Sequence, residues 1–330
     1  MKRILGIGNA LVDVLAQVSD EAILKELGLP KASMQLIDES RFEQIMSRMS
    51  EMHTKFAAGG SACNTILALG NLGARPGVIG KVGNDNNGAF FERNCLEHGI
   101  TPHLLRDTLP TGVASTFITP DGQRTFGTYL GAASRLTPDE IREEWFDDYG
   151  YLYIEGYLVQ NHDLIERIIR YASGRGLKVC LDMASYNIVA EDRAFFRKLL
   201  KRVDIVFANK DEARAFSGGK SPREALDELA DICEVAIVKI GPEGAMAKRG
   251  SEMVKVPARP VEKVLDSTGA GDYFSAGFLY GHAQGDSLAE CVRKASVLAA
   301  YVIEVIGTTL SSRVWDAIRH EVTPLKAFQD

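Results

Sequence analysis

The sequence predicts an α/β protein built on a mostly parallel, helix-covered sheet, with a second and smaller β-sheet projecting from it. The first observation is a series of short apolar runs, most of them separated by segments in which apolar residues recur at helical spacing. Alternating strands and helices favour parallel pairing. The second observation is that two stretches of extended pattern interrupt this rhythm. The third is composition, because 330 residues with 45% hydrophobic and 25% charged residues suffice for one large core with a smaller appendage, or for two domains.

The apolar runs define the strands in chain order. Those of the main sheet are expected at residues 3–8, 77–80, 151–154, 177–182, 204–207 and 235–240. The interrupting stretches are residues 10–18 with 33–38, and 112–119 with 124–130 around the turn sequence Pro120-Asp121-Gly122, which predicts a β-hairpin. Without a long linker or an internal repeat, the small sheet should be interleaved with the large domain. We therefore expect a large domain at 1–9, 40–110 and 132–330, and a small β-domain at 10–39 and 111–131.

Charge and composition exclude several classes of protein. The net charge is −6 and no basic run is present, which argues against a nucleic-acid partner. The apolar stretches are too short or too interrupted to span a bilayer, and the first residues lead straight into a strand pattern, so we expect a cytoplasmic protein without a membrane partner. Five scattered cysteines without Cys-x-x-Cys spacing are expected to be reduced thiols, and no zinc site is predicted.

The most informative segment is Asp266-Ser267-Thr268-Gly269-Ala270-Gly271-Asp272, where an extended pattern gives way to a helical one. Unpaired N–H groups at a helix N-terminus and the positive end of the helix dipole can bind an anion, and small residues let it approach the backbone. We therefore expect Gly269, Ala270 and Gly271 to form an anion hole. A carboxylate beside bound phosphate is electrostatically unfavourable, so its presence there suggests a function. Asp272 suits a general base that takes the proton from an attacking hydroxyl. The alternative is an ordinary Gly-rich turn with Asp272 interacting with the helix dipole.

A second motif, Ala58-Gly59-Gly60-Ser61-Ala62-Cys63-Asn64, also begins a helical pattern. Together the two motifs resemble the two signatures of the ribokinase-like, or pfkB, family of carbohydrate and nucleoside kinases. The resemblance covers nearly the whole chain, including the segments Gly6–Asp13, Asn209–Glu212 and Lys239–Gly244. One departure is Ser267, where the family usually has threonine, and the hydroxyl is kept.

The resemblance implies a ribokinase-like three-layer α/β/α sandwich with a β-sheet lid over the acceptor. It implies an ATP-dependent phosphotransferase that uses Mg²⁺ and phosphorylates a primary hydroxyl of a small-molecule nucleoside or sugar. Asp13 matches the family's substrate-binding aspartate and could accept two hydroxyl hydrogen bonds. Without the family, an aspartate in this position is more commonly a turn or cap residue. Gly59, Gly60 and Asn64 would contact the acceptor, the alternative being close helix packing beside an exposed asparagine.

The same resemblance assigns a nucleotide side to the site. Asn209 and Glu212 match an element that arranges Mg²⁺ and the donor phosphates, Glu212 through water, although the pair also reads as a helix cap. The remaining residues implied for ATP are Lys239, Gly241, Gly244, Ala299 and Ile303. Without the family, the glycines are turn residues and the apolar pair is ordinary core. Asp266 and Thr268, with the region around Gly307 and Ser311, match positions that bind a monovalent cation such as K⁺.

Three segments favour a nucleoside acceptor, with adenosine first and AMP as its product. Residues 8–13, 34–37 and 130–133 resemble segments of the family's adenosine kinases, with Gln35 and Ile37 on one face of a lid strand and Leu130 across the pocket. A base needs apolar walls, whereas a sugar needs more polar partners. The same apolar lid would also suit a homodimer interface. Ribokinase, fructokinase or 2-keto-3-deoxygluconate kinase activity stays open, and so does a non-catalytic binding protein. A dinucleotide oxidoreductase ranks low because Leu11 replaces the third glycine of its motif.

Overall fold

The protein, described here by a computed structural model of residues 1–121 and 123–323, contains two β-sheets. In the described residues the larger sheet has nine strands in the order β14-β13-β12-β11-β10-β9-β1-β5-β6. All neighbours pair in parallel except at the edge, where β12, β13 and β14 are antiparallel. The strands are β1 (Arg3–Ile7), β5 (Gly77–Gly83), β6 (Thr101–Asp107), β9 (Tyr149–Glu155), β10 (Lys178–Asp182), β11 (Ile205–Asn209), β12 (Val235–Lys239), β13 (Ala245–Arg249) and β14 (Glu252–Val256).

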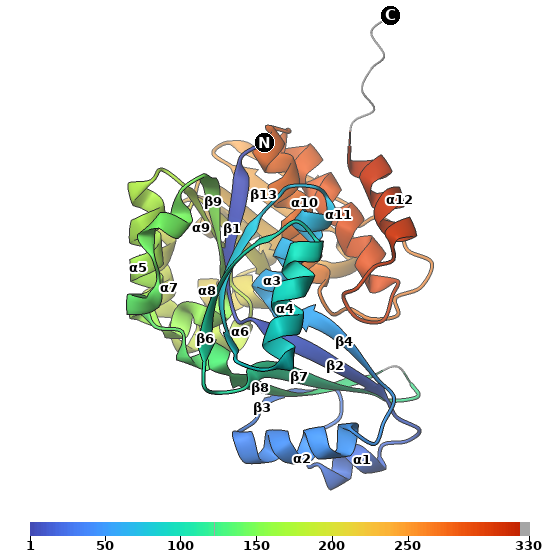
Figure 1. Cartoon of the computed structure of the whole chain (residues 1–330). Helices are drawn as coiled ribbons and strands as arrows, with labels where there is room; N and C mark the ends of the chain where they lie inside the picture. The colour runs from blue at the N-terminus through green and yellow to red at the C-terminus, as the bar shows by residue number, and fades with distance from the viewer. Residues whose placement is uncertain (122, 324–330) are drawn as a thin grey trace, which may run out of the picture.

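Helices cover both faces of this sheet, which confirms the predicted three-layer arrangement (Figure 1). One core lies under α3 (Ser61–Asn71), α4 (Asn86–Glu97), α10 (Ala270–Gln284), α11 (Leu288–Ile303) and α12 (Ser312–Val322). The other lies under α5 (His162–Gly174), α6 (Tyr186–Glu191), α7 (Arg193–Leu200), α8 (Lys210–Ser217) and α9 (Pro222–Ala230). Since successive residues of a strand point to opposite faces, β9 contributes Tyr153 to the first core and Ile154 to the second.

The smaller sheet projects from one end of the large domain and is covered on one face by α1 and α2 (Figure 1). Its order is β3-β8-β7-β2-β4. The elements are β2 (Leu11–Gln17), α1 (Ala22–Glu26), β3 (Met34–Leu36), α2 (Glu39–Met49), β4 (Thr54–Gly59), β7 (Thr111–Ile118) and β8 (Arg124–Gly131). A third, smaller core between this sheet and its two helices contains Val12, Val14 and Ile45.

The strands expected from the apolar runs are present, but the boundary of the small domain needs correction. Residues 40–110 were assigned to the large domain, whereas β4 pairs antiparallel with β2 and α2 packs on the small sheet. The pattern of β4, Thr-Lys-Phe-Ala-Ala-Gly, contains too few bulky apolar residues to reveal a strand. The hairpin of β7 and β8 forms as predicted. Its turn residue Gly122 lies outside the described residues.

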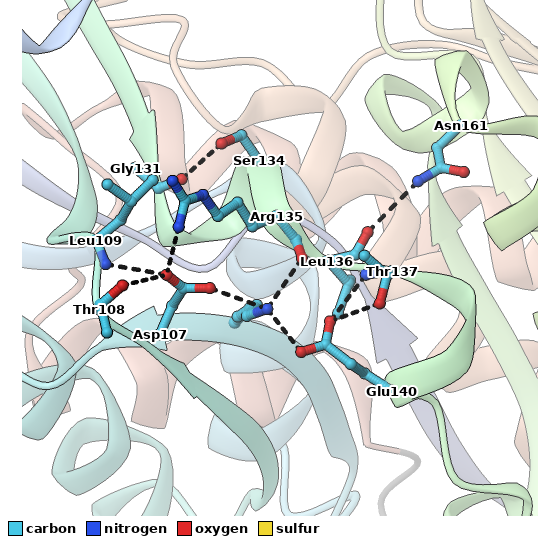
Figure 2. A network of polar contacts seen from close by, with 11 residues as sticks. Asp107, Thr108, Leu109, Gly131, Ser134, Arg135, Leu136, Thr137, Glu140 and Asn161 are labelled. Carbon is cyan, nitrogen blue, oxygen red and sulfur yellow. Dashed lines mark hydrogen bonds and ion pairs between the residues drawn. The ribbon is translucent and has the colours of Figure 1, made fainter.

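The connection from β6 to β7 and the segment that follows β8 meet in one network of polar contacts, which includes Asp107, Leu109, Arg135 and Glu140 (Figure 2). The Nζ atom of Lys81, on β5, lies 3.0 Å from Asp107, 2.6 Å from Glu140 and 2.9 Å from the Arg135 carbonyl oxygen. The same aspartate accepts the Leu109 N–H (2.9 Å), and so one network fixes both connections to the small sheet.

Lys81→Met is expected to lower the free energy of unfolding by about 3 kcal/mol, because it removes a buried cation from two part-buried carboxylates. Urea unfolding at pH 7 would measure the loss. The matched control is Arg249→Met, which removes an exposed pair with Glu252 and should cost about 1 kcal/mol or less. If Lys81→Met and Arg249→Met lowered the free energy of unfolding equally, burial of Lys81 would not add to the strength of its ion pairs.

Among the described residues, none of the helices combines the length and the apolar character required to cross a membrane.

Candidate active site

The glycine-rich segment near the carboxyl end forms the N-terminus of α10, as predicted. Gly269 is the N-cap in the left-handed conformation, and α10 begins at Ala270. The Ala270 N–H donates to the Ser267 carbonyl oxygen (3.2 Å), whereas within the described chain the N–H groups of Gly269 and Gly271 have no hydrogen-bond acceptor. All three residues are half-buried, so this helix end is partly open to solvent. This helix end can therefore receive an anion.

The two motifs meet at Asp272. Its carboxylate accepts hydrogen bonds from the Ser61 hydroxyl (2.7 Å) and the Asn64 side-chain amide (2.9 Å), both in the first turn of α3. The Thr65 hydroxyl donates to the Asp272 carbonyl oxygen (3.1 Å). Burial raises the pKa of Asp272 to about 6, against the opposing effect of the Asn64 and Ser61 hydrogen bonds. A carboxylate with this pKa can accept a proton near neutral pH.

Asp13 lies on β2 opposite Ala57 of β4, and its side chain reaches the glycine pair Gly59–Gly60 at the end of that strand. A β-carbon at Gly59 would lie 2.2 Å from Oδ1 of Asp13, so only glycine allows this approach. Gly60 has φ +96° and a β-carbon there would lie 2.0 Å from the Asn9 carbonyl oxygen. Burial raises the pKa of Asp13 to about 7, although Arg124 opposes the shift. Asp272 also acts on the pKa of Asp13, which places the two carboxyl groups in one electrostatic site.

Glu155, at the end of β9, is a buried carboxyl that the sequence analysis did not identify. Its oxygens accept the Asn9 side-chain amide (2.6 Å) and the Ala62 N–H (2.9 Å). Asn9 lies between β1 and β2, and Ala62 follows the passage from β4 into α3, so one carboxyl ties two connections between the sheets. Burial raises the pKa of Glu155 to about 7.

A chain of buried charges lies behind the anion-binding loop. The Nζ atom of Lys239 lies 3.0 Å from Asp182 at the end of β10, and a β-carbon at Gly271 would lie 3.1 Å from the same Nζ. Asp182 also accepts the Ser275 hydroxyl (3.2 Å), from the second turn of α10. Although burial by itself lowers the pKa of an ammonium group, Asp182 and Glu212 outweigh it and the pKa of Lys239 is raised. The sequence predicted Lys239 here but not Asp182.

Asn209 and Glu212 form a reciprocal helix cap at the start of α8. The Asn209 side chain accepts the N–H groups of Asp211 and Glu212, and Glu212 accepts the Asn209 N–H (2.7 Å) and side-chain amide (2.6 Å). Burial raises the pKa of Glu212 to about 7. The described residues contain no group of three or more His, Cys, Asp or Glu side chains that could enclose a metal ion. This donor set fits Mg²⁺ only as an ion that keeps most of its water ligands.

The other residues assigned to ATP flank this edge of the large sheet. Gly241 and Gly244 have positive φ in the connection between antiparallel β12 and β13, so the alternative of a hairpin turn holds for them. Ile303 ends α11, and its carbonyl oxygen accepts the N–H groups of Leu265 and Asp266 beside the anion-binding loop. Ala299 lies one turn earlier and is half-buried.

Asp266 and Arg124 join the loop to the small sheet. Nη2 of Arg124, the first residue of β8, lies 2.8 Å from Oδ2 of Asp266, and the two side chains are 8% and 2% exposed. The contact is an ion pair without hydrogen-bond geometry, since Nη2 has no aligned acceptor. No sequence motif includes Arg124.

The strand register determines which side chains of the small sheet face the large domain. Val12 and Val14 on β2 pack against α2, so Leu11, Asp13 and Leu15 lie on the opposite, inner face. Residues aligned with these across the sheet share that inner face, and they include Gly112, Ala114, Thr116, Met34, Leu36, Arg124, Phe126, Thr128 and Leu130.

Leu130 is thus on the expected face, whereas the prediction for Gln35 and Ile37 is wrong. Gln35 aligns with Gly127, and a β-carbon at Gly127 would lie 2.9 Å from Ile45 of α2 and 3.4 Å from Ile37. Gln35 and Ile37 therefore lie on the helix-covered face. Their neighbours Met34 and Leu36 take the inner face and are 48% and 64% exposed.

Comparison with known proteins places this geometry in one family. Residues 32–315 match the pfkB family carbohydrate kinases. The chain is 36% identical to a solved adenosine kinase from Sinorhizobium meliloti (TM-score 0.87, covering 97% of this chain and 99% of that one). It is 33% identical to a solved protein described as a probable sugar kinase from Rhizobium etli (TM-score 0.87, covering 97% and 98%). Adenosine kinase 2 of Arabidopsis thaliana is 25% identical over 335 residues, covering 93% of this chain and 95% of that protein. The chain therefore belongs to the pfkB family of carbohydrate kinases and is a phosphotransferase that uses ATP and an alcohol group of a nucleoside or sugar.

Proposed function

We propose that this kinase transfers the γ-phosphoryl group of ATP to the primary hydroxyl of adenosine and so forms AMP. The observation that carries the proposal is the inner face of the small sheet. That face carries one carboxylate, Asp13, together with the apolar side chains of Leu15, Met34, Leu36, Phe126 and Leu130. A purine needs apolar walls and the ribose diol needs an acceptor of hydrogen bonds, and this face supplies both.

In this proposal the acceptor hydroxyl lies between Asp272 and the anion-binding loop. Asn64 gives its amide N–H to Asp272, and its Oδ1 is buried without a hydrogen-bond partner in the described chain. That free oxygen can accept a hydroxyl of the ribose. Asp272 takes the proton, while the N–H groups at Gly269 and Gly271 stabilise the charge of the transferring group. Because phosphoryl transfer needs little covalent work by the protein, alignment accounts for most of the rate gain.

The donor side follows from the buried charges. Lys239 lies close enough to Gly271 to act on the phosphates at the loop. Mg²⁺, when bound, neutralises phosphate charge, and Glu212 and Asn209 would hold it through water. Gly241, Gly244, Ala299 and Ile303 border the nucleotide. Closure of the small domain over the acceptor would exclude water and suppress ATP hydrolysis.

A release assay for ADP across adenosine, inosine, guanosine, ribose, fructose and 2-keto-3-deoxygluconate tests the acceptor. We expect adenosine to give a kcat/KM at least about tenfold above every other compound, the size of effect that one well-filled apolar pocket provides. Chromatography should identify AMP as the product. A preference for ribose, fructose or the keto acid would overturn the nucleoside assignment and leave the kinase chemistry intact.

A homodimer through the small sheet is the second use for Met34 and Leu36, because exposed apolar side chains on an edge strand also suit self-association. Sedimentation with and without adenosine distinguishes a dimer interface from a base pocket. If the protein is a monomer and Met34 and Leu36 become protected from solvent only when adenosine is bound, the base pocket is supported.

A further inference from the structure

The Arg124–Asp266 ion pair is a direct charged contact between the small sheet and the anion-binding segment. Asp266 lies three residues before Gly269, and Arg124 lies 142 residues earlier in the chain than Asp266. Gly307 also lies near the small sheet, since a β-carbon built at this glycine would lie 3.6 Å from Leu15 on the inner face of that sheet. The anion-binding segment and the connection between α11 and α12 therefore both lie against the small sheet.

The Asp266 carboxylate has three positive or donor partners. Oδ1 accepts the Thr268 N–H (3.0 Å), and Oδ2 accepts the Gly307 N–H (2.9 Å) and lies beside the Arg124 guanidinium. With the side chain of Asp266 only 2% exposed, little solvent shields this charge from the guanidinium. The carboxylate is neutralised by the protein itself.

These contacts test the cation site that the family resemblance assigned to Asp266, Thr268, Gly307 and Ser311. A bound K⁺ would rely on Asp266 as the charged donor, and that carboxylate faces a guanidinium. The Ser311 hydroxyl accepts the Val314 N–H as the N-cap of α12, and the Gly307 N–H points at Asp266. A cation beside Arg124 would meet a full positive charge at short range. The residues present do not fit a monovalent cation in this arrangement.

We propose that Arg124 takes the place of a monovalent cation in this chain. When the small sheet lies over the large domain, its guanidinium neutralises Asp266 and holds the segment that carries the anion-binding amides. Order in this segment thus depends on domain closure instead of on a bound ion. Arg124 is a positioning residue in this sense, and the inference goes beyond the kinase chemistry proposed above.

The first test needs no substrate and uses the full chain. Melting temperatures are measured in 100 mM KCl and in 100 mM tetramethylammonium chloride, a cation too large for such a site. For the wild type we expect the two values to agree within about 1 °C. Arg124→Gln should melt higher in KCl, because the freed carboxylate is open to the ion, and the double variant Arg124→Gln with Asp266→Asn should lose this difference. Arg124→Lys keeps a positive charge and should behave as the wild type.

A matched control is Arg48→Gln, which removes a more exposed ion pair with Glu26 in the same domain and should leave K⁺ without effect. A clear stabilisation of the wild type by K⁺, or no response in Arg124→Gln, would overturn the proposal. The second readout is ADP release with the best acceptor. Wild-type kcat should change less than twofold between the two salts, while Arg124→Gln should gain at least threefold in K⁺. If no acceptor is phosphorylated, the function proposed above fails, and the melting experiment still decides the role of Arg124.

Discussion

Asp272→Asn is expected to lower kcat by about 10²–10⁴-fold, the usual contribution of a positioned general base. The new amide has nearly the same shape as the carboxylate, and the buried Oδ1 of Asn64 is free to accept its N–H after an amide flip. The fold should therefore survive. ADP release measures the loss, and an unchanged melting temperature with retained ATP binding provides the control. A variant with near-wild-type kcat would remove Asp272 from the chemistry.

The same carboxyl group sets the acid side of the pH profile. Burial raises the pKa of Asp272 to about 6 and that of Asp13 to about 7, and the two groups interact. A base acts only when deprotonated, so kcat/KM for the acceptor should fall on acidification with an apparent pKa between about 6 and about 7 that belongs to the pair. In Asp272→Asn the residual rate should still fall on acidification, but only with the titration of Asp13. A flat profile between pH 5 and 8 in the wild type would contradict both assignments.

The parts of the site that the sequence predicted are local in the chain. Gly269 to Asp272 and Gly59 to Asn64 each combine small residues with polar ones at a helix start, and helix ends have the same physics wherever they occur. That the two helix ends meet, with Ser61 and Asn64 bonded to Asp272, could be expected only through the family resemblance.

The parts that the sequence did not reveal depend on pairing between distant segments. Arg124, Asp182 and Glu155 are single charged residues in strand patterns, and their roles appear only when Asp266, Lys239 and Asn9 lie beside them. No motif marks them, although a charged residue at the end of an apolar strand, as in Asp182 and Glu155, is a usable signal for a site at that sheet edge.

The error at Gln35 and Ile37 has a different cause. Alternation along a strand shows which residues share a face, and these two do share one. Which face carries helices is decided by the position of α2, which packs on the small sheet and was assigned to the large domain from the sequence. A short edge strand such as β3, with three residues, contains no further information about its orientation.

Asp13→Asn is expected to lower kcat/KM for the acceptor by about 10²–10⁴-fold while stabilising the free protein above pH 7. The loss follows from two charge-assisted hydrogen bonds to the ribose, each worth about 1.5–3 kcal/mol. Initial-rate kinetics with adenosine would measure it, and the effect should be far smaller on ATP binding.

The gain in stability has a definite sign. Burial raises the folded-state pKa of Asp13 from 3.8 to about 7, so the group favours the folded state when protonated and disfavours it when ionised. This contribution to stability is present below pH 3.8 and is lost as the pH rises through about 7. The variant has no such loss, and the difference in unfolding free energy between variant and wild type should grow from pH 4 to pH 8. The rise of the pKa from 3.8 to about 7 sets a ceiling of roughly 4 kcal/mol on this effect, which partial exposure of the side chain reduces.

Asp121→Asn is the matched control, because Asp121 is an exposed carboxyl of the same domain whose pKa is lowered to about 2, chiefly by Lys31 and Thr119. Its contribution is present above pH 3.8 and is lost as the pH falls through about 2, so the difference in unfolding free energy between this variant and the wild type should stay nearly constant between pH 4 and pH 8. A difference that grows with pH in Asp13→Asn but stays level in Asp121→Asn would show that the site holds Asp13 at a cost to stability that bound acceptor offsets. The same pH dependence in both variants, or full activity in Asp13→Asn, would mean that this carboxyl is an ordinary residue of β2.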